Sequence, residues 1–380
     1  MPFGARHRIV DFVLSNIVNS GIYAVYLLVQ YKAQSLIEHV SASWRIGGRL
    51  PETFVTVVPP QMRASETWYS GTADAVYQNL NLVADFGPDL VVVFGADHVY
   101  RMDIRQMIQH HLASRADATV AARPVPIAEA SSFGIMATGP DGRVTGFTEK
   151  PSAPEPMPGD PGCALGSMGN YVFSSDVLVD VLREDARRAT DHDFGRTIVP
   201  GLLARHRVFA YNFRHNRVPG VRPHEEPAYW RDVGTLAAYY QAQMDLLGGE
   251  PAFDLDNSRW PIFARSVEGP AVRILSGRVE DSLIGEGSTI DGARITRSIL
   301  GRGVRVARGA VVEQSIVMDY TEIGEGARLV HAVVDRFNHV PPGARLEPGA
   351  AAADGLELHR DPSGILVVPR GPSVGPPPVG

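Results

Sequence analysis

Short apolar runs alternate with amphipathic segments over residues 1–245 of the chain. Apolar residues recur near helical spacing over Asp11–Ser20, and a glycine follows, so this segment is predicted to be a helix. Leu90–Phe94 is a continuous aliphatic and aromatic run, typical of a parallel strand covered on both faces. A helix over Asp103–Ala113 and a strand over Ala118–Ala122 are predicted next. This alternation predicts an α/β fold with a doubly wound, mostly parallel sheet.

From about residue 270 the pattern becomes a repeat of about 17 residues. Three series of aliphatic residues recur along it: Leu283, Leu300, Val317 and Val334; Ile290, Val306, Ile323 and Val340; Ile295, Val312, Leu329 and Leu346. Aliphatic positions five or six residues apart predict a parallel β-helix with a triangular cross-section. Stacked coils bury an aliphatic column that no single coil could bury. The alternative is a β-sandwich, but sandwich strands do not keep a fixed register over successive repeats.

The changes of pattern divide the chain into four predicted parts. Residues 1–247 form the α/β domain, and residues 248–268, which lack clear periodicity and contain glycines and prolines, form a linker. Residues 269–355 form the β-helix, and residues 356–380 form a C-terminal segment. The Pro/Gly-rich tail from Gly371 is predicted to be disordered.

Composition excludes several classes of function. The formal net charge is −6, and no polybasic run occurs, so neither nucleic acid nor an anionic membrane is a predicted partner. No apolar run reaches the roughly 18 residues of a membrane-spanning helix. Cys163 is the single cysteine, so no internal disulfide can form and a cytoplasmic location is predicted. Only Lys32 and Lys150 are lysines among 36 basic residues, so a retained lysine indicates a need for a compact charge.

Two acidic residues are candidates for binding a metal. Asp97 follows a buried strand and a Gly-Ala pair, and ligands of open α/β sheets bind beyond the carboxyl ends of strands. The alternative for Asp97 is an ordinary helix cap. Asp232 precedes Val-Gly-Thr, a pattern that is often only turn chemistry. Together, two carboxylates from distant chain positions could share one Mg²⁺, which prefers few carboxylates plus substrate phosphates.

Lys150 and the segment Trp68–Asp74 are candidates for binding anions. Pro151 disfavours helix at Lys150, so an extended backbone is predicted that could aim the ammonium at a phosphate. The alternative is an exposed surface lysine. Trp68–Asp74 runs from aromatic to small residues at a predicted helix start, where backbone N–H groups favour anions, although many helices start in this way. Four residues without a nearby base or metal-ligand spacing are interpreted as structural: Cys163, His110, His111 and His192.

Motifs in order along nearly the whole chain define a family resemblance. They are Pro2–Gly4, Arg8–Phe12, Gln30–Lys32, Trp68–Ala75, Gly95–Tyr100, Phe133–Gly134, Glu149–Pro151, Ser167–Gly169, His192–Gly195 and Tyr229–Thr235. These segments resemble the bacterial glucose-1-phosphate adenylyltransferases, or ADP-glucose pyrophosphorylases, and most closely the actinobacterial type. The resemblance implies a Rossmann-like nucleotidyltransferase domain followed by a left-handed parallel β-helix.

The resemblance also implies the chemistry. ATP and glucose 1-phosphate would give ADP-glucose and pyrophosphate with Mg²⁺, for glycogen or related α-glucan synthesis, without a covalent protein intermediate. A cytoplasmic homotetramer controlled by small-molecule allosteric effectors is expected.

Roles of single residues follow only from this resemblance. Asp97 and Asp232 would hold the metal, and Lys150 would bind the sugar phosphate. The glucose end of the site would be lined by Tyr69, Gly134, Glu149 and Ser167, with Glu149 accepting sugar hydroxyls. The nucleotide contacts would be Gln61, Gly71 and Thr72. Where the family often has two glutamines, this chain has Gln61-Met62.

The sequence departs from the family at its start. The family opens with a strand and a Gly-rich loop that cradles the ATP phosphates, and this sequence starts beyond that segment. A start site assigned too late in the gene is expected, because Met1 stands where valine is common and GTG is a bacterial start codon. Without the loop, very poor catalysis is expected, since one missing donor to a developing charge costs about 10²–10³ in rate.

Two other functions remain open at this stage. One is a non-catalytic sugar-nucleotide-binding or regulatory paralogue, although retention of Asp97, Lys150 and Asp232 argues against long decay. The other is a related enzyme that makes a different nucleotide sugar, which the Glu149–Pro151 and Ser167–Gly169 segments disfavour.

Overall fold

The computed structural model describes residues 1–46, 52–61, 68–264, 270–350 and 356–372. The chain divides into two compact units. The β-helix unit consists of Met1–Ser15, Ala96–Arg101 and Pro219–Gly380, and the sheet unit consists of Asn16–Gly95 and Met102–Val218. The β-helix unit therefore combines the C-terminal repeats with segments from the first part of the sequence.

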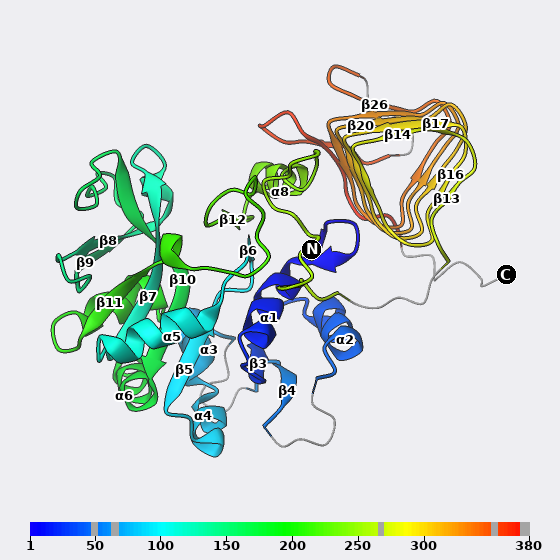
Figure 1. The fold of residues 1–380 in the computed structure, drawn as a ribbon. Coiled ribbons are helices and arrows are strands. Elements are labelled where there is room, and N and C mark those ends of the chain that lie inside the picture. Colours follow the sequence, from blue (N-terminus) through cyan, green and yellow to red (C-terminus); the bar gives the residue numbers. More distant parts are fainter. Residues whose placement is uncertain (47–51, 62–67, 265–269, 351–355, 373–380) are drawn as a thin grey trace. The chain divides into compact units, whose positions relative to one another are not determined.

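The sheet unit is built on a mixed sheet (Figure 1). Its strands lie in the order β11 (Val208–Asn212), β7 (Ala118–Pro126), β10 (Cys163–Ser174), β8 (Gly134–Thr138) and β9 (Val144–Glu149), and β5 (Leu90–Phe94) also pairs with β10. Strand β10 runs antiparallel to β5, β7 and β8, whereas β11 runs parallel to β7. Strands β5, β7 and β11 therefore share one direction, but β10 inserts among them in the opposite direction, so the sheet predicted to be mostly parallel is mixed.

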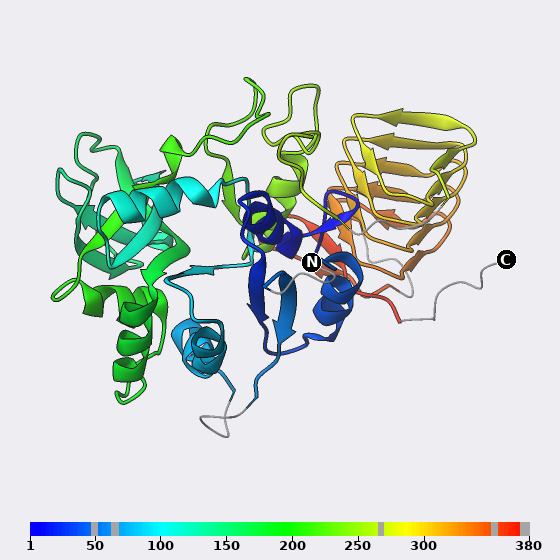
Figure 2. The ribbon, with the colours of Figure 1, turned by 60° about the horizontal axis from the view of Figure 1, so that its bottom comes forward.

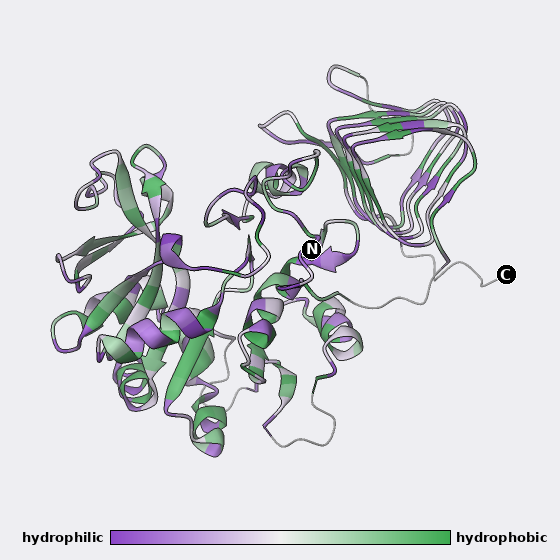
Figure 3. Ribbon diagram, viewed as in Figure 1, coloured by the Kyte–Doolittle hydropathy of each residue, from purple (hydrophilic) through white to green (hydrophobic). Residues whose placement is uncertain are grey.

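The helices and strands predicted within residues 1–245 are present with small shifts of their ends. The predicted strand Leu90–Phe94 is β5, which is hydrophobic along its length (Figure 3). The predicted helix at 103–113 is α5 (Ile104–Ala113), and the Asp103 carboxylate caps it by accepting a hydrogen bond from the Arg105 N–H. The predicted helix at 11–20 is α1 (Ile9–Asn19). Apolar periodicity therefore located these elements correctly.

The remaining elements of the sheet unit are short. They are β3 (Ala24–Leu28), α2 (Gln34–Ser43), β4 (Phe54–Val58), α3 (Thr72–Tyr77), α4 (Leu80–Phe86), α6 (Ser175–Asp185), η2 (Phe194–Ile198), α7 (Val199–Leu202) and the single turns η1 (Ala130–Ser132) and η3 (Phe213–His215). Strands β3 and β4 pair in parallel. The core includes Phe173, Leu178, Phe194 and Ile198, each almost fully buried between β10, α6 and η2.

The repeats of the β-helix unit form parallel sheets that outline a triangle (Figure 1), with the coils stacked on one another (Figure 2). The first sheet contains β13 (Arg273–Ile274), β16 (Thr289–Ile290), β19 (Arg305–Val306), β22 (Glu322–Ile323) and β25 (His339–Val340). The second contains β14 (Gly277–Glu280), β17 (Ala293–Thr296), β20 (Val311–Glu313), β23 (Arg328–Val330) and β26 (Arg345–Leu346). The third contains β15 (Leu283–Ile284), β18 (Ile299–Leu300), β21 (Ile316–Val317), β24 (Ala332–Val334), β28 (Leu366–Val368) and β27 (His359–Arg360). These sheets match the predicted left-handed parallel β-helix.

Two of the three predicted aliphatic columns are correct in every member. The register pairs Ile290 through Val340 along the first sheet, and Ile295 through Leu346 along the second. In the third sheet Leu300, Val317 and Val334 are fully buried, but the predicted first member, Leu283, is wrong. Ile284 pairs with Leu300 instead, because the first coil is one residue shorter than the others.

Leu283 belongs to the outer face of the third sheet. It pairs with Ile299, and this face joins a second core that contains residues of α8 (Leu236–Met244). That core also contains Phe3 of the hairpin β1 (Pro2–Phe3) and β2 (His7–Arg8). The outer face of one β-helix sheet is therefore buried against the N-terminal hairpin and α8.

Apolar residues in the described part of the predicted linker are packed into a core. Phe253, Trp260 and Ile262 are buried, and the Phe253 ring lies 5.8 Å from the ring of Phe12. Residues 265–268 of the predicted linker lie outside the described residues, as does the predicted disordered tail from residue 373 on. Within the described ranges, no helix combines the length and the apolar character needed to cross a membrane.

Candidate active site

The two acidic candidates lie at one end of a pair of strands in the β-helix unit. Strand β6 (His98–Tyr100) pairs antiparallel with β12 (Trp230–Asp232), and this register places Asp232 opposite His98. Asp97 immediately precedes β6, so the pairing brings Asp97 and Asp232 to the same end of the ladder. The Asp97 side chain is 74% exposed, and Asp232 is also exposed.

The His98 imidazole lies close to both carboxylates. Its Nε2 atom is 3.5 Å from Oδ1 of Asp97. Burial lowers the pKa of His98, and the charges of Asp97 and Asp232 oppose that shift. One Asp232 oxygen accepts a hydrogen bond of 2.9 Å from the Gly234 N–H. This bond orients the carboxylate and leaves its other oxygen available.

This donor set fits Mg²⁺. Among the described residues, no cluster of three or more His, Cys, Asp or Glu side chains is arranged to hold a metal. Mg²⁺ does not require such a cluster, because it is commonly held by one or two carboxylates together with water and substrate phosphate. The exposed carboxylates of Asp97 and Asp232, at one end of the strand pair, are therefore suitable ligands for a Mg²⁺ ion that is also bound to a substrate phosphate.

Glu149 and Gly134 lie side by side at one end of the β8–β9 pair in the sheet unit. The register pairs them directly. A Cβ atom at Gly134 would lie 2.6 Å from Oε2 of Glu149 and 2.6 Å from the Phe147 ring, so a side chain here would force Glu149 and Phe147 to move. Burial and the nearby Asp193 charge raise the pKa of Glu149, whereas Lys150 and Arg196 act in the opposite direction. The glycine thus makes room for a carboxylate in a partly buried acidic setting.

The backbone prediction for Lys150 is wrong. Lys150 has a φ of +48°, in the left-handed region rather than in an extended conformation. Strand β9 ends at Glu149, and the Lys150 N–H donates a 3.0 Å hydrogen bond to the Phe133 carbonyl, which holds the turn. The side chain is exposed. A strained backbone of this kind persists only when its surroundings impose it.

Gly71 and Thr72 contact the segment 191–194. A Cβ atom at Gly71 would lie 2.3 Å from the His192 carbonyl oxygen. The Thr72 hydroxyl donates to Asp193 at 2.9 Å and accepts from the Phe194 N–H at 3.1 Å. The start of α3 is therefore fastened to the segment that leads into η2.

Asp193 was not among the predicted site residues. Its carboxylate accepts hydrogen bonds from the N–H groups of Gly195 and Arg196 and from the Thr72 hydroxyl, and its charge acts on Glu149. Asp193 belongs to the motif His192–Gly195, in which an acid stands between a histidine and an aromatic residue, and this pattern could have marked it as a candidate. Only the fold shows that it lies next to Glu149.

The other predicted residues are held by local contacts. Among the described residues, the Tyr69 hydroxyl accepts a 3.0 Å hydrogen bond from Asn79, and Gln61 donates to the Pro59 carbonyl at 3.0 Å. The Ser167 hydroxyl accepts from the Gly169 N–H at 3.2 Å, next to an irregularity in the β10–β7 register. These bonds do not connect Tyr69, Gln61 and Ser167 to one another.

The fold and these groups define a class of protein. The sequence profile of the nucleotidyl transferase family matches residues 1–249, and the profile of the GlmU-like C-terminal hexapeptide region matches residues 268–368. The chain therefore belongs to the nucleotidyl transferases and carries a hexapeptide-repeat region.

Curated relatives narrow the family. The chain is 48% identical over 371 residues to a glucose-1-phosphate adenylyltransferase of Thermodesulfovibrio yellowstonii, covering 97% of this chain and 90% of that protein. The corresponding protein of Anaeromyxobacter is 46% identical, with 99% and 93% covered, and that of Frankia casuarinae is 43% identical, with 98% and 92% covered. Within the nucleotidyl transferases, the chain belongs to the family of glucose-1-phosphate adenylyltransferases. The predicted family and enzyme class are confirmed, and nothing in these similarities supports a non-catalytic paralogue.

Proposed function

We propose that the protein transfers the adenylyl group of ATP to glucose 1-phosphate and so forms ADP-glucose and pyrophosphate. The observation that carries this proposal is the similarity, at 48% identity over 371 residues, to a protein named glucose-1-phosphate adenylyltransferase. The paired strands that bring Asp97 and Asp232 together support it, because nucleotidyl transfer requires several phosphate charges to be neutralised.

In the sheet unit, Glu149 and Lys150 would bind different parts of glucose 1-phosphate. The Glu149 carboxylate would accept hydrogen bonds from glucose hydroxyls, from a position beside Gly134 that a side chain on residue 134 would disturb. The adjacent Lys150 ammonium would pair with the sugar phosphate as a point charge. Their neighbouring positions would let one substrate molecule contact both groups and so orient its phosphate for reaction.

In the β-helix unit, Asp97 and Asp232 would hold Mg²⁺. When bound, the metal would neutralise part of the charge on the phosphates. A phosphate oxygen of glucose 1-phosphate attacks the α-phosphorus of ATP, the bond to pyrophosphate breaks, and no group on the protein is covalently modified. The residues of the chain contribute binding, orientation and charge.

The oligomeric state, the regulation and the metabolic use of the product are proposed from family membership alone. They are a cytoplasmic homotetramer, control by small-molecule allosteric effectors and a product that feeds glycogen or a related α-glucan. Each has its own measurement: mass in solution, activity in the presence of candidate effectors, and glucan content after deletion of the gene.

Pyrophosphorolysis tests the proposed reaction. The purified protein is supplied with pyrophosphate, Mg²⁺ and one nucleotide sugar at a time: ADP-glucose, UDP-glucose, dTDP-glucose or GDP-mannose. Fastest release of glucose 1-phosphate from ADP-glucose is expected. A preference for another nucleotide sugar would identify a different nucleotidyl transferase, and tight ADP-glucose binding without turnover would favour a regulatory role.

A further inference from the structure

Two adjacent glutamates bind arginines in the two chain segments that contain Asp97 and Asp232. Glu225 accepts a 2.6 Å hydrogen bond from Arg101, the residue directly after strand β6. Both side chains are almost fully buried, with 4% of Arg101 and 3% of Glu225 exposed. Separating a buried ion pair leaves an uncompensated charge away from water, so this contact holds the end of β6 in place.

Glu226 binds the partner strand. Its two carboxylate oxygens accept hydrogen bonds from the two terminal nitrogens of Arg231, the residue directly before Asp232 in β12. Arg231 also donates to Asp245 at 3.0 Å, and its guanidinium lies 4.3 Å from the centre of the Tyr229 ring. A bidentate pair of this kind fixes direction as well as distance.

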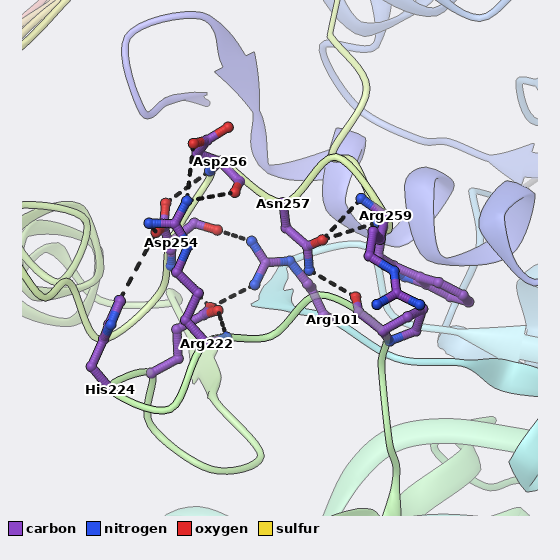
Figure 4. Close-up of polar contacts among 10 residues, drawn as sticks. Arg101, Arg222, His224, Asp254, Asp256, Asn257 and Arg259 are labelled. Atoms are coloured by element: carbon purple, nitrogen blue, oxygen red, sulfur yellow. Dashed lines mark hydrogen bonds and ion pairs between the residues drawn. The ribbon is translucent and has the colours of Figure 1, made fainter.

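The segment that carries the two glutamates is itself anchored. Figure 4 shows the Arg101 guanidinium between Asp254 and Asn257, with Arg222 beside it. Arg101 donates to the Asp254 carbonyl, and the Asp254 N–H donates to Glu225 at 3.0 Å. The Glu226 N–H donates to the Ala252 carbonyl at 2.9 Å. The glutamates are therefore fixed to residues 252–254 as well as to the arginines.

The ladder itself needs such support. Strands β6 and β12 pair over three residues each, and a short two-stranded pair is marginally stable on its own. Because Glu225 and Glu226 are consecutive, the distance between the two arginine contacts is set by one residue step of the backbone. Movement of either strand along the other would break one of the two contacts.

We propose that Glu225 and Glu226 form a double arginine clamp that sets the separation of Asp97 and Asp232, and so tunes how the carboxylate pair binds a divalent cation. This inference rests on the proposed metal-binding role of those two carboxylates. Glu225, Glu226, Arg101 and Arg231 are positioning residues and do not touch the metal. Outer partners that orient metal ligands typically change metal affinity by about 10–100-fold when they are mutated.

The test measures cation binding directly. Mn²⁺ replaces Mg²⁺, and its free concentration is followed by electron paramagnetic resonance in the presence of saturating ADP-glucose. Glu226→Gln is expected to raise the Mn²⁺ dissociation constant about 10-fold. Arg231→Lys keeps the charge but loses the planar fork, so a similar rise is expected. Glu225→Gln is expected to act in the same direction and, because its partner is buried, to lower the unfolding midpoint as well.

Glu347→Gln is the matched control. Glu347 accepts hydrogen bonds from Arg328 at 2.6 Å and from Arg345 at 2.8 Å, so it binds arginine in the repeats as Glu226 does beside β12. Its replacement is expected to leave Mn²⁺ affinity within about twofold, as for a surface substitution. A purely structural role for Glu226 would make the two variants behave alike.

Asp97→Asn separates this inference from the proposed function. If Asp97→Asn weakens Mn²⁺ binding while Glu226→Gln and Arg231→Lys leave it unchanged, the clamp is overturned and the metal assignment stands. If Asp97→Asn has no effect on Mn²⁺ binding, the metal assignment is wrong and the clamp is overturned with it. Weaker binding in all three variants, with Glu347→Gln unchanged, supports both.

Discussion

The β-helix and the candidate active site use their side chains in opposite ways. Leu329 and Val312 of the β-helix column are fully buried, whereas the Asp97 side chain is 74% exposed. Residues of the column stabilise the fold because their side chains are removed from water. Residues of the site stay exposed, so that their polar atoms can bind a ligand. Substitutions in the column should therefore change the free energy of unfolding, and substitutions in the site should change turnover or substrate binding.

The largest effect is expected in the column. Leu329→Ala should lower the unfolding free energy by about 2–5 kcal/mol, because it leaves a cavity between stacked coils. Leu283→Ala removes the same atoms from a partly buried position outside the column and should cost about 1 kcal/mol. Denaturant unfolding followed by circular dichroism measures both. If the two substitutions lowered the unfolding free energy equally, the register predicted from the sequence would be correct, with Leu283 as the first residue of the buried column.

The second largest effect is expected in the candidate active site, on turnover. Asp97→Asn keeps the shape of the side chain but removes its charge, so kcat should fall by about 10²–10³. The unfolding free energy should change by less than about 0.5 kcal/mol, because the side chain is exposed. Asp180→Asn, an exposed carboxylate on α6, is the control for charge removal. If Asp97→Asn instead lowered the unfolding free energy so far that unfolding explained the lost turnover, Asp97 would be a structural residue.

A buried histidine predicts how stability depends on pH. Burial lowers the pKa of His7 from its ordinary value of 6.5 to about 4, and the ring lies 3.2 Å from the Ile262 carbonyl oxygen. The unfolded chain takes up a proton near pH 6.5 and the folded protein does not, so stability falls as pH decreases from 6.5 to 4. The loss should total about 3 kcal/mol, at about 1.4 kcal/mol per pKa unit.

His7→Gln is the variant that isolates this effect. Glutamine can still donate to the Ile262 carbonyl but cannot take up a proton in this range. Its unfolding free energy, measured at several pH values, should show a smaller slope than that of the parent protein between pH 6.5 and 4. Identical slopes would show that other groups dominate the acid sensitivity.

The smallest effect is expected at the sugar phosphate. Lys150→Ala should raise the KM for glucose 1-phosphate roughly 10–100-fold, because a hydrogen bond to a charged group contributes about 1.5–3 kcal/mol. The KM for ATP serves as the internal control and should change little. Lys150→Arg should restore binding only in part, since its fork is larger and planar. An unchanged KM for glucose 1-phosphate would remove Lys150 from the site.

The burial pattern of the β-helix was predictable because the same spacing of aliphatic residues recurs in successive coils. Two aliphatic columns, Ile290 to Val340 and Ile295 to Leu346, followed directly from spacing, since every coil repeats the same burial. Among the three columns, the one wrong residue was Leu283, predicted where Ile284 stands, because the first coil is shorter than the others by one residue. In a strand, a shift of one position moves a side chain to the other face.

The sequence by itself determined the α/β class, the β-helix and the motifs of the candidate site, because these depend on local spacing and residue type. Tertiary structure alone decided the direction of β10, the left-handed backbone of Lys150 and the meeting of Asp97 with Asp232. It also decided that Glu225 and Glu226 bind Arg101 and Arg231. The Arg101–Glu225 bond and the β6–β12 pairing join segments more than 100 residues apart, and the β7–β10 pairing also joins segments that do not follow one another directly. Local spacing carries no information about such contacts.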